Sequence, residues 1–172
     1  SDGTKYFESL KSNVTNLGMI FGKEDLAEKS IKDIDSKLEK VQKKNEGSTA
    51  LVLMVSDGSM SVFAEGSRFA SIYSDFGFKS ADSSIEVSNH GQDISYEYLL
   101  SHNTDYLFVI DRGAVTGSDS ASAKDIVEND VVKNTDVYKK GNIVYLNPEA
   151  WYLGSGLMST DIMIKEIEEA IK

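Results

Sequence analysis

The sequence of 172 residues contains no cysteine, one proline, one tryptophan and two histidines. Without cysteine, neither a disulfide framework nor a thiolate metal site is possible. The motifs G-x-S-x-G and H-E-x-x-H are absent, and so is any paired-histidine spacing suited to a metal. These absences argue against a catalytic triad and against a metal site built from protein ligands alone.

Long apolar runs and excess positive charge are also missing. No stretch approaches the roughly 18 apolar residues of a membrane span, and no basic segment followed by an apolar one marks a signal peptide. The formal net charge of −10 argues against nucleic acid as a partner. An anionic ligand would therefore need a local positive site. Because the chain starts at Ser1 without methionine, we expect a mature or trimmed piece of a longer protein.

Two helices are predicted in the first part of the chain. Apolar residues recur at helical spacing from residue 6 to residue 21, and Gly22 closes that run. A second stripe follows from residue 24 to residue 44, with many charges on its other faces. This charge density predicts an exposed connecting helix; the alternative is an ordinary amphipathic helix packed on a sheet.

From residue 49 onward, predicted strands and helices alternate. Residues 50–55 and 106–110 are continuous apolar runs, typical of strands covered on both faces. Shorter strands are predicted at 61–64, 85–87 and 142–146. Helices are predicted at 67–76, 94–100 and 157–172, and residues 120–133 are expected to be helical in one or two pieces. The pattern predicts an α/β fold, with a three-layer α/β/α lobe, a mostly parallel central sheet and a long connecting helix before it.

The two arginines of the chain, Arg68 and Arg112, both fall at junctions between elements. Arg112 follows a buried strand, and ligands of open α/β sheets bind at the carboxyl ends of strands. Arg68 starts a predicted helix, where a cation is disfavoured unless an anion lies against it. A guanidinium suits oxygen-rich anions. The alternative is that each arginine makes a local salt bridge, Arg112 with Asp111.

Three other rare side chains lie near strand ends. His90 is in a loop between a predicted strand and helix, and the alternative to a ligand contact is plain solvent exposure. Trp151 and Tyr152 follow the last predicted strand. Tyr152 could donate a hydrogen bond or supply an oxygen ligand to a hard metal ion, unless both rings only pack the loop on the core. His102, at the end of a predicted helix, is interpreted as structural.

A glycine-rich loop at residues 112–120 offers a competing interpretation. It lies between a strand and a helix, where backbone N–H groups can hold phosphate. It lacks the lysine and hydroxyl ending of a P-loop and does not fit G-x-G-x-x-G. As a nucleotide motif it is therefore weak.

Four segments, taken in order, resemble the siderophore branch of the class III (helical-backbone) periplasmic-type binding proteins. They are Gly66-Ser67-Arg68-Phe69, His90-Gly91-Gln92, residues 106–113 ending in Asp111-Arg112-Gly113, and residues 147–153 containing Trp151-Tyr152-Leu153. The Asp-Arg-Gly and Trp-Tyr-Leu motifs are similar to those of the petrobactin and enterobactin-type (catecholate) members. The resemblance covers nearly the whole chain.

The resemblance implies a division of the chain and a role for each site residue. Residues 1–22 would be the last helix of an amino-terminal lobe, 23–47 the connecting backbone helix, and 48–172 the carboxy-terminal siderophore-binding lobe. Arg68 and Arg112 would contact catecholate oxygens, beside Trp151. His90 and Tyr152 would ligate Fe(III) when the siderophore supplies only four donors. Glu65 lies where members carry an acidic contact for the membrane permease; a solvated acid is the alternative.

The function implied is that of a binding protein and not an enzyme. It would capture a ferric, petrobactin-like siderophore and deliver it to an ABC importer, with no intrinsic cofactor. By resemblance it would be periplasmic or, in a Gram-positive cell, a lipoprotein tethered to the outer face of the membrane. Two alternatives remain: a nucleotide-binding enzyme domain using residues 113–120, and a haem or corrinoid binder in which Trp151 and Tyr152 stack on a macrocycle.

Overall fold

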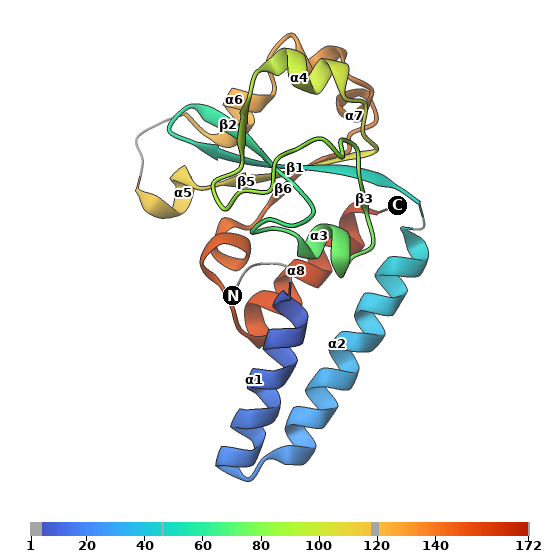
Figure 1. Ribbon diagram of the computed structural model, residues 1–172, viewed down its shortest axis with the longest axis vertical. Helices are drawn as coiled ribbons and strands as arrows, with labels where there is room; N and C mark the ends of the chain where they lie inside the picture. Colours follow the sequence, from blue (N-terminus) through green and yellow to red (C-terminus); the bar gives the residue numbers. More distant parts are fainter. Residues whose placement is uncertain (1–4, 46, 118–120, 172) are drawn as a thin grey trace.

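The computed structural model describes residues 5–45, 47–117 and 121–171. Two long antiparallel helices, α1 (Tyr6–Phe21) and α2 (Glu24–Lys44), extend from a layered body that holds the rest of the chain (Figure 1). Gly22, with a φ of 59°, ends α1, so the two predicted helices are confirmed. Within these ranges, no helix combines the length and apolar character that a membrane crossing requires.

Six strands among the described residues form one sheet in the order β4-β2-β1-β5-β6, with β3 beside the start of β1. Strands β1, β5 and the edge strand β6 run parallel, as does the short β3 beside β1, and the continuous apolar runs of the sequence predict β1 and β5 correctly. The hairpin partner β2 and the edge strand β4 are antiparallel. The bounds are β1 (Thr49–Ser56), β2 (Ser59–Phe63), β3 (Lys79–Ser80), β4 (Gln92–Ile94), β5 (Tyr106–Asp111) and β6 (Ile143–Leu146).

Helices cover both faces of this sheet. Along β1, Ala50 and Val52 face one hydrophobic cluster, whereas Leu51 and Leu53 face the other, as strand alternation requires. One face carries α3 (Ser71–Ser74) and α8 (Leu157–Ala170); the other carries α4 (Tyr96–Ser101), α6 (Ala123–Val127) and α7 (Asp136–Lys139) (Figure 1). The predicted three-layer α/β/α architecture with a mostly parallel sheet is confirmed.

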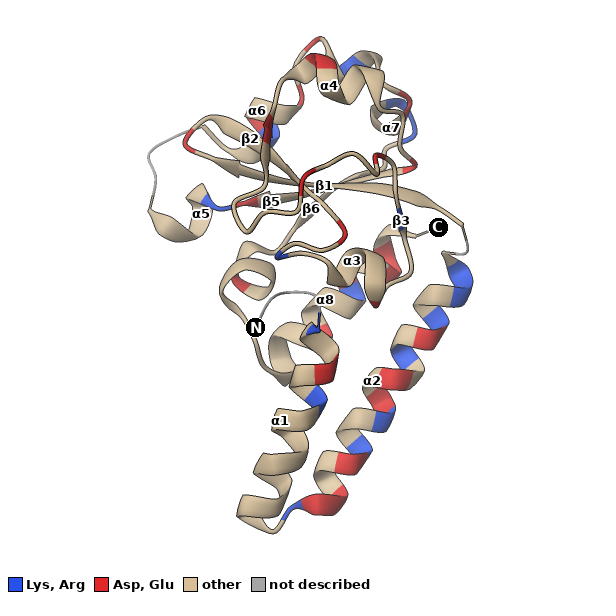
Figure 2. Ribbon diagram, viewed as in Figure 1, with Lys and Arg blue, Asp and Glu red and all other residues tan. Residues whose placement is uncertain are grey.

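The helical hairpin has two different surfaces. Close to its turn, a Cβ on Gly18 would lie 2.7 Å from the Cβ of Ala27, so glycine allows the two helices to approach. Charges line α2, whereas the half of α1 near the turn carries none (Figure 2). Leu17, Ile20 and Phe21 are exposed there. The hairpin end is therefore apolar on its α1 side.

Three local predictions were wrong. Residues 85–87 form no strand, because the Glu86 N–H is taken by the side-chain oxygen of Gln92 at 3.2 Å. The helix expected at 67–76 is reduced to α3, and Arg68 lies in the turns before it. Residue 94 is still part of β4, so the next helix begins at Tyr96.

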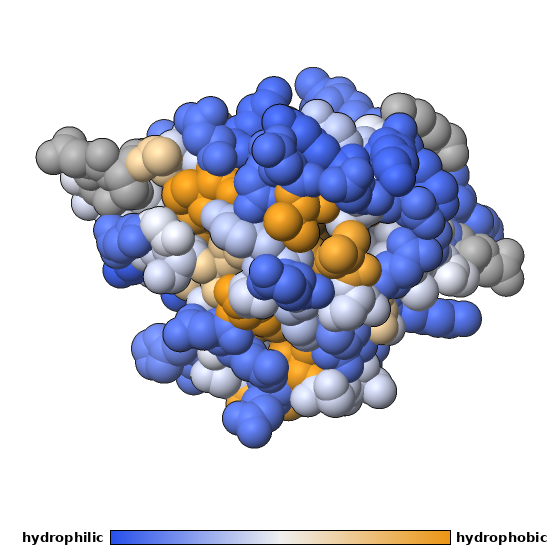
Figure 3. Space-filling view, turned by 90° about the horizontal axis from the view of Figure 1, so that it is seen from above, coloured by the Kyte–Doolittle hydropathy of each residue, from blue (hydrophilic) through white to orange (hydrophobic). Residues whose placement is uncertain are grey.

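The region expected to be helical in one or two pieces at 120–133 forms two in its described part, α6 and a 3₁₀ turn (Val132–Asn134). Residues 118–120, which belong to the glycine-rich loop, lie outside the described residues; before them the chain forms the short helix α5 (Gly113–Thr116). Seen from above, the surface is mostly hydrophilic, with apolar side chains in separate patches (Figure 3).

Candidate functional site

Arg112 follows β5 directly, at the carboxyl edge of the parallel strands. Its backbone N–H bonds the carbonyl of Val55, which continues the pairing with β1. The guanidinium donates from Nη1 to the hydroxyl of Ser56 at 2.7 Å and from Nε to the hydroxyl of Tyr152 at 2.9 Å. Ser56 and Tyr152 thus hold the Arg112 guanidinium at the carboxyl edge of the sheet, where the sequence predicts it.

The carboxylate nearest to Arg112 is not the one that sequence proximity favours. Nη1 lies 3.8 Å from the largely exposed carboxylate of Asp57. Asp111 instead accepts the backbone N–H groups of Ala114 at 3.1 Å and Ala123 at 2.8 Å. The suggested Arg112–Asp111 pair is therefore replaced by a contact with Asp57, and Asp111 organises the start of the glycine-rich loop.

Arg68, in the turns after β2, also contacts Tyr152. Its Nη2 donates to the backbone carbonyl of Tyr152 at 2.7 Å. The guanidinium carbon lies 4.1 Å from the centre of the Tyr152 ring, a cation–π distance. Arg68 itself is exposed, so its remaining N–H groups face solvent. The two arginines of the sequence thus converge on one tyrosine.

Tyr152 belongs to a π-helical turn (Glu149–Leu153), hereafter the π turn. The bond that defines it joins the Gly154 N–H to the Glu149 carbonyl at 2.7 Å, and such turns are frequent at functional sites. Trp151 in the same turn is 6% exposed, and its ring lies 5.9 Å from that of Phe76. Trp151 is therefore held in the core, while Tyr152 is partly exposed.

A cleft of about 690 Å³ opens beside these groups. Arg68, Trp151 and Tyr152 line it, together with Asn89 and Tyr6. The cleft therefore combines aromatic and polar walls with one exposed cation, Arg68. Arg112 is connected to it through its hydrogen bond to the Tyr152 hydroxyl. Such a site suits an anionic ligand with aromatic parts.

His90 lies on the loop that contributes Asn89 to the cleft. It is exposed, and its backbone N–H bonds the hydroxyl of Ser88 at 3.1 Å. Gly91 follows with a φ of 76°, and a Cβ there would lie 2.8 Å from the ring of Phe63. The structure thus brings Arg68, Arg112 and Tyr152 together, with His90 on the neighbouring loop.

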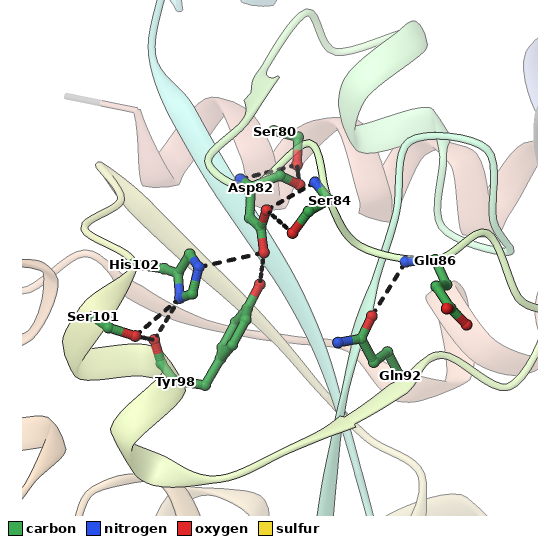
Figure 4. Close-up of polar contacts among 8 residues, drawn as sticks. All are labelled: Ser80, Asp82, Ser84, Glu86, Gln92, Tyr98, Ser101 and His102. Atoms are coloured by element: carbon green, nitrogen blue, oxygen red, sulfur yellow. Dashed lines mark hydrogen bonds and ion pairs between the residues drawn. The ribbon is translucent and has the colours of Figure 1, made fainter.

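A polar network anchors the start of that loop, and sequence analysis missed it (Figure 4). Asp82 accepts the N–H and hydroxyl of Ser84 at 2.8 and 2.6 Å, and the hydroxyl of Tyr98 at 2.7 Å. These hydrogen bonds, with Ser84 foremost, hold the pKa of Asp82 below its ordinary value. Burial raises the pKa of Tyr98.

His102 completes the network from the end of α4. Its Nδ1 lies 2.9 Å from the Tyr98 carbonyl and its Nε2 lies 3.4 Å from Asp82, while its ring stacks on Tyr98 at 4.0 Å. The structural interpretation of His102 is thus confirmed. The one sequence signal for the network is the spacing of Tyr98 and His102, which places them one helical turn apart.

Glu65 lies in the turn after β2 and is exposed. Its Oε1 accepts the backbone N–H of Ser80 at 3.1 Å. Within the described parts of the chain, no group of three or more histidine, cysteine, aspartate or glutamate side chains is arranged to hold a metal ion. Most donors to any metal at this site would therefore have to come from its ligand.

Comparisons with known proteins agree with this geometry. Residues 1–150 match the periplasmic binding protein family, so the chain belongs to that family. It is 44% identical to the petrobactin-binding protein YclQ of Bacillus subtilis, over 99% of this chain and 55% of that protein. It is 34% identical to the ferric-anguibactin-binding protein FatB of Vibrio anguillarum, over 94% of this chain and 51% of that one.

Solved structures of siderophore-binding proteins also resemble this chain. The crystal structure of YclQ superposes with a TM-score of 0.93 at 43% identity, covering 100% of this chain and 61% of that one. The catecholate-siderophore binding protein VctP of Vibrio cholerae superposes with a TM-score of 0.92 at 35% identity, covering 98% and 62%. The chain thus spans about half the length of the curated relatives it matches.

Proposed function

We propose that the protein is an extracytoplasmic solute-binding component of an ABC importer, which captures a ferric catecholate siderophore of the petrobactin type and delivers it to the permease. The observation that carries the proposal is the convergence of Arg68 and Arg112 on Tyr152 beside the cleft. Two relatives named for binding petrobactin and ferric anguibactin support it. On this proposal the protein is not an enzyme and needs no cofactor of its own.

The arginines have a clear physical task in such a site. A ferric catecholate complex carries several negative charges, whereas the protein has a net charge of −10. Moving such an anion into a partly desolvated cleft is costly unless cations lie against it. Arg68 already faces solvent with free donors, and its planar fork matches the oxygens of a catecholate.

Tyr152 and His90 are proposed as Fe(III) ligands when the siderophore leaves coordination positions open. Fe(III) is a hard ion, and a phenolate oxygen suits it. Arg112 donates to the Tyr152 hydroxyl, a contact that holds this oxygen in place at the edge of the cleft. His90 is exposed on the loop that lines the cleft through Asn89, so its imidazole is free to turn toward a ligand. Trp151 would add an aromatic wall.

The domain division and the partner contacts belong to the same proposal. Residues 1–22 are assigned to an amino-terminal lobe, 23–47 to the connecting helix and 48–172 to the ligand-binding lobe. The exposed apolar side chains of Leu17, Ile20 and Phe21 favour this division, because a second lobe would cover them. Glu65, exposed after β2, is proposed as the permease contact. Periplasmic location, or tethering by a lipid anchor, completes the proposal.

A ligand titration tests the proposal against its rivals. Trp151 lines the cleft and is the one tryptophan of the sequence, so its fluorescence reports on occupancy. We expect ferric catecholates to quench it, and haem, a corrinoid and ATP to leave it unchanged. Quenching by ATP without any response to ferric catecholates would favour the nucleotide-binding alternative, and a response confined to haem or the corrinoid would favour a macrocycle.

A further inference from the structure

Glu166 of α8 accepts two hydrogen bonds at the π turn, one from a residue just before the turn and one from a residue within it. Its Oε1 accepts the backbone N–H of Asn147 at 2.8 Å, and its Oε2 accepts the indole N–H of Trp151 at 2.8 Å. The side chain is only partly exposed. One carboxylate thus joins the chain just before the π turn, at Asn147, to an aromatic ring in the middle of that turn.

These two contacts fix the turn that carries Tyr152. Asn147 extends the attachment, because its side-chain oxygen accepts the Ala150 N–H at 2.9 Å and its carbonyl accepts the Trp151 N–H at 3.0 Å. Tyr152 is the next residue, and its carbonyl and hydroxyl receive the two arginines. Hydrogen bonds therefore connect Glu166 to Trp151, and the peptide bond from Trp151 to Tyr152 completes the path to the arginine contacts.

The chemistry of the two partners requires an ionised carboxylate. Both partners are N–H donors, and a carboxylate offers two acceptor oxygens, whereas a glutamine would set one of its own N–H groups against a donor. Burial raises the pKa of Glu166, so the ionised form is held at some cost in free energy. An apolar residue would leave the Asn147 N–H and the Trp151 indole N–H without this acceptor, so the carboxylate is what holds these two groups in place.

We propose that Glu166 is a positioning residue: it holds the π turn so that Tyr152 presents its carbonyl to Arg68 and its hydroxyl to Arg112. The role of Tyr152 toward iron rests on the proposed function, but the positioning itself concerns residues that are in contact without any ligand. Glu166 touches neither arginine and acts through Trp151 and Asn147.

The sequence supplies its own reporters for a test by NMR. With one tryptophan and two arginines, a ¹H–¹⁵N spectrum contains one indole signal and two arginine Nε–H signals, and Tyr152→Phe assigns the signal of Arg112. In Glu166→Gln we expect the indole signal to move and the Arg112 Nε–H to exchange faster with solvent. Glu169→Gln, an exposed position on the same helix, is the matched control and should change neither signal.

Trp151→Phe is a second variant that keeps the test possible if Glu166→Gln does not fold. It removes only the indole donor, and both arginine signals can still be observed. It should also speed exchange at Arg112. A shift of the indole signal in Glu166→Gln with the Arg112 signal unchanged would overturn the proposal, since Glu166 would then serve the packing of Trp151 only.

The same variants are then titrated with ferric petrobactin. We expect Glu166→Gln to weaken binding by roughly 10-fold to 100-fold, the range for residues that orient a metal ligand, while Glu169→Gln binds like the parent. If the parent itself does not bind, the proposed function fails while the arginine signals still decide the positioning role. Parent-like affinity in Glu166→Gln would overturn the positioning role alone.

Discussion

Arg112 donates its Nε proton to the hydroxyl of Tyr152 at 2.9 Å, although 40 residues separate the two in the sequence. The contact joins the end of β5 to the π turn, and thus two neighbouring parallel strands at their carboxyl edge. Arg68 approaches the same tyrosine from the turn after β2. The candidate site is therefore built where three chain segments meet.

Replacing Arg112 by alanine should weaken binding of a ferric catecholate by about 2–5 kcal/mol, the range measured when one partner of a buried, hydrogen-bonded charge pair is removed. Isothermal titration with ferric petrobactin measures this. Arg112→Lys keeps the charge but cannot reproduce the planar fork that reaches Ser56 and Tyr152, so an intermediate affinity is expected.

Lys124→Ala is the matched control, because it removes one positive charge at an exposed position of α6. Its affinity should stay close to that of the parent. An Arg112→Ala variant that binds as tightly as this control would exclude Arg112 from the site.

Replacing Tyr152 by phenylalanine should abolish the phenolate-to-iron charge-transfer band that we expect with a tetradentate ferric catecholate. A hexadentate ligand, which fills all six coordination positions of iron, should still bind. Visible absorption spectra of the two complexes provide the measurement. Tyr6→Phe is the control, because Tyr6 lines the same cleft and bonds Thr160 at 2.9 Å. A band that survives in Tyr152→Phe rules out this phenolate as a ligand.

The sequence predicts those parts of the fold that follow from local apolar patterns. The runs that became β1 and β5 are long and apolar on both faces, so the sheet and the edge bearing Arg112 could be inferred. The segment Ile85-Glu86-Val87 alternates as a short strand would, but the side chain of Gln92 takes the Glu86 N–H. The hydrophobic periodicity of a sequence does not reveal a competing side-chain hydrogen bond of this kind.

The site could be predicted only as a set of separate residues. Arg68 and Tyr152 are 84 residues apart. The sequence around either residue does not indicate that the Arg68 guanidinium donates to the Tyr152 carbonyl. Sequence analysis also missed Glu166 and Asp82. An acidic residue on a helix or in a loop is usually solvated, so neither residue stands out in the sequence. Their roles become visible only through their partners.

Replacing Asp82 by asparagine should lower the free energy of unfolding at pH 7 by about 1.5–3 kcal/mol, the range for hydrogen bonds to a charged group. The pKa of Asp82 is lowered in the fold, so the carboxylate stabilises the protein above its unfolded-state pKa of about 4. That stabilisation is lost as the pH falls through the lower pKa of the folded state. The gap between parent and variant should therefore narrow at low pH.

Urea unfolding at pH 7 and pH 3 measures this gap. Asp93→Asn is the control, because Asp93 is exposed and its carboxylate accepts the Ser61 hydroxyl at 2.8 Å; a small change is expected there. A gap for Asp82→Asn that is equal at both pH values would show that its ionised carboxylate is not what stabilises the loop.

Replacing Gly91 by alanine should destabilise the protein and weaken ferric petrobactin binding together. Gly91 has a φ of 76°, and an added Cβ would lie 2.8 Å from the ring of Phe63 and 3.0 Å from the Cβ of Ser61. Gly141→Ala is a close control, because its φ is 70° but no atom lies within 4 Å of the added Cβ. Both variants bear the left-handed strain of about 1–2 kcal/mol, and only Gly91→Ala adds overpacking of about 1–3 kcal/mol.

Because Phe63 is fully buried, we expect the backbone of residues 89–91 to move and not the ring. This movement displaces Asn89 from the cleft wall and shifts His90 beside it. Urea unfolding gives the difference in stability, and titration with ferric petrobactin gives the difference in affinity. Gly141→Ala should lose stability but keep the affinity of the parent. If Gly91→Ala also kept that affinity while losing more stability than the control, the loop would be structural and His90 would have no part in holding iron.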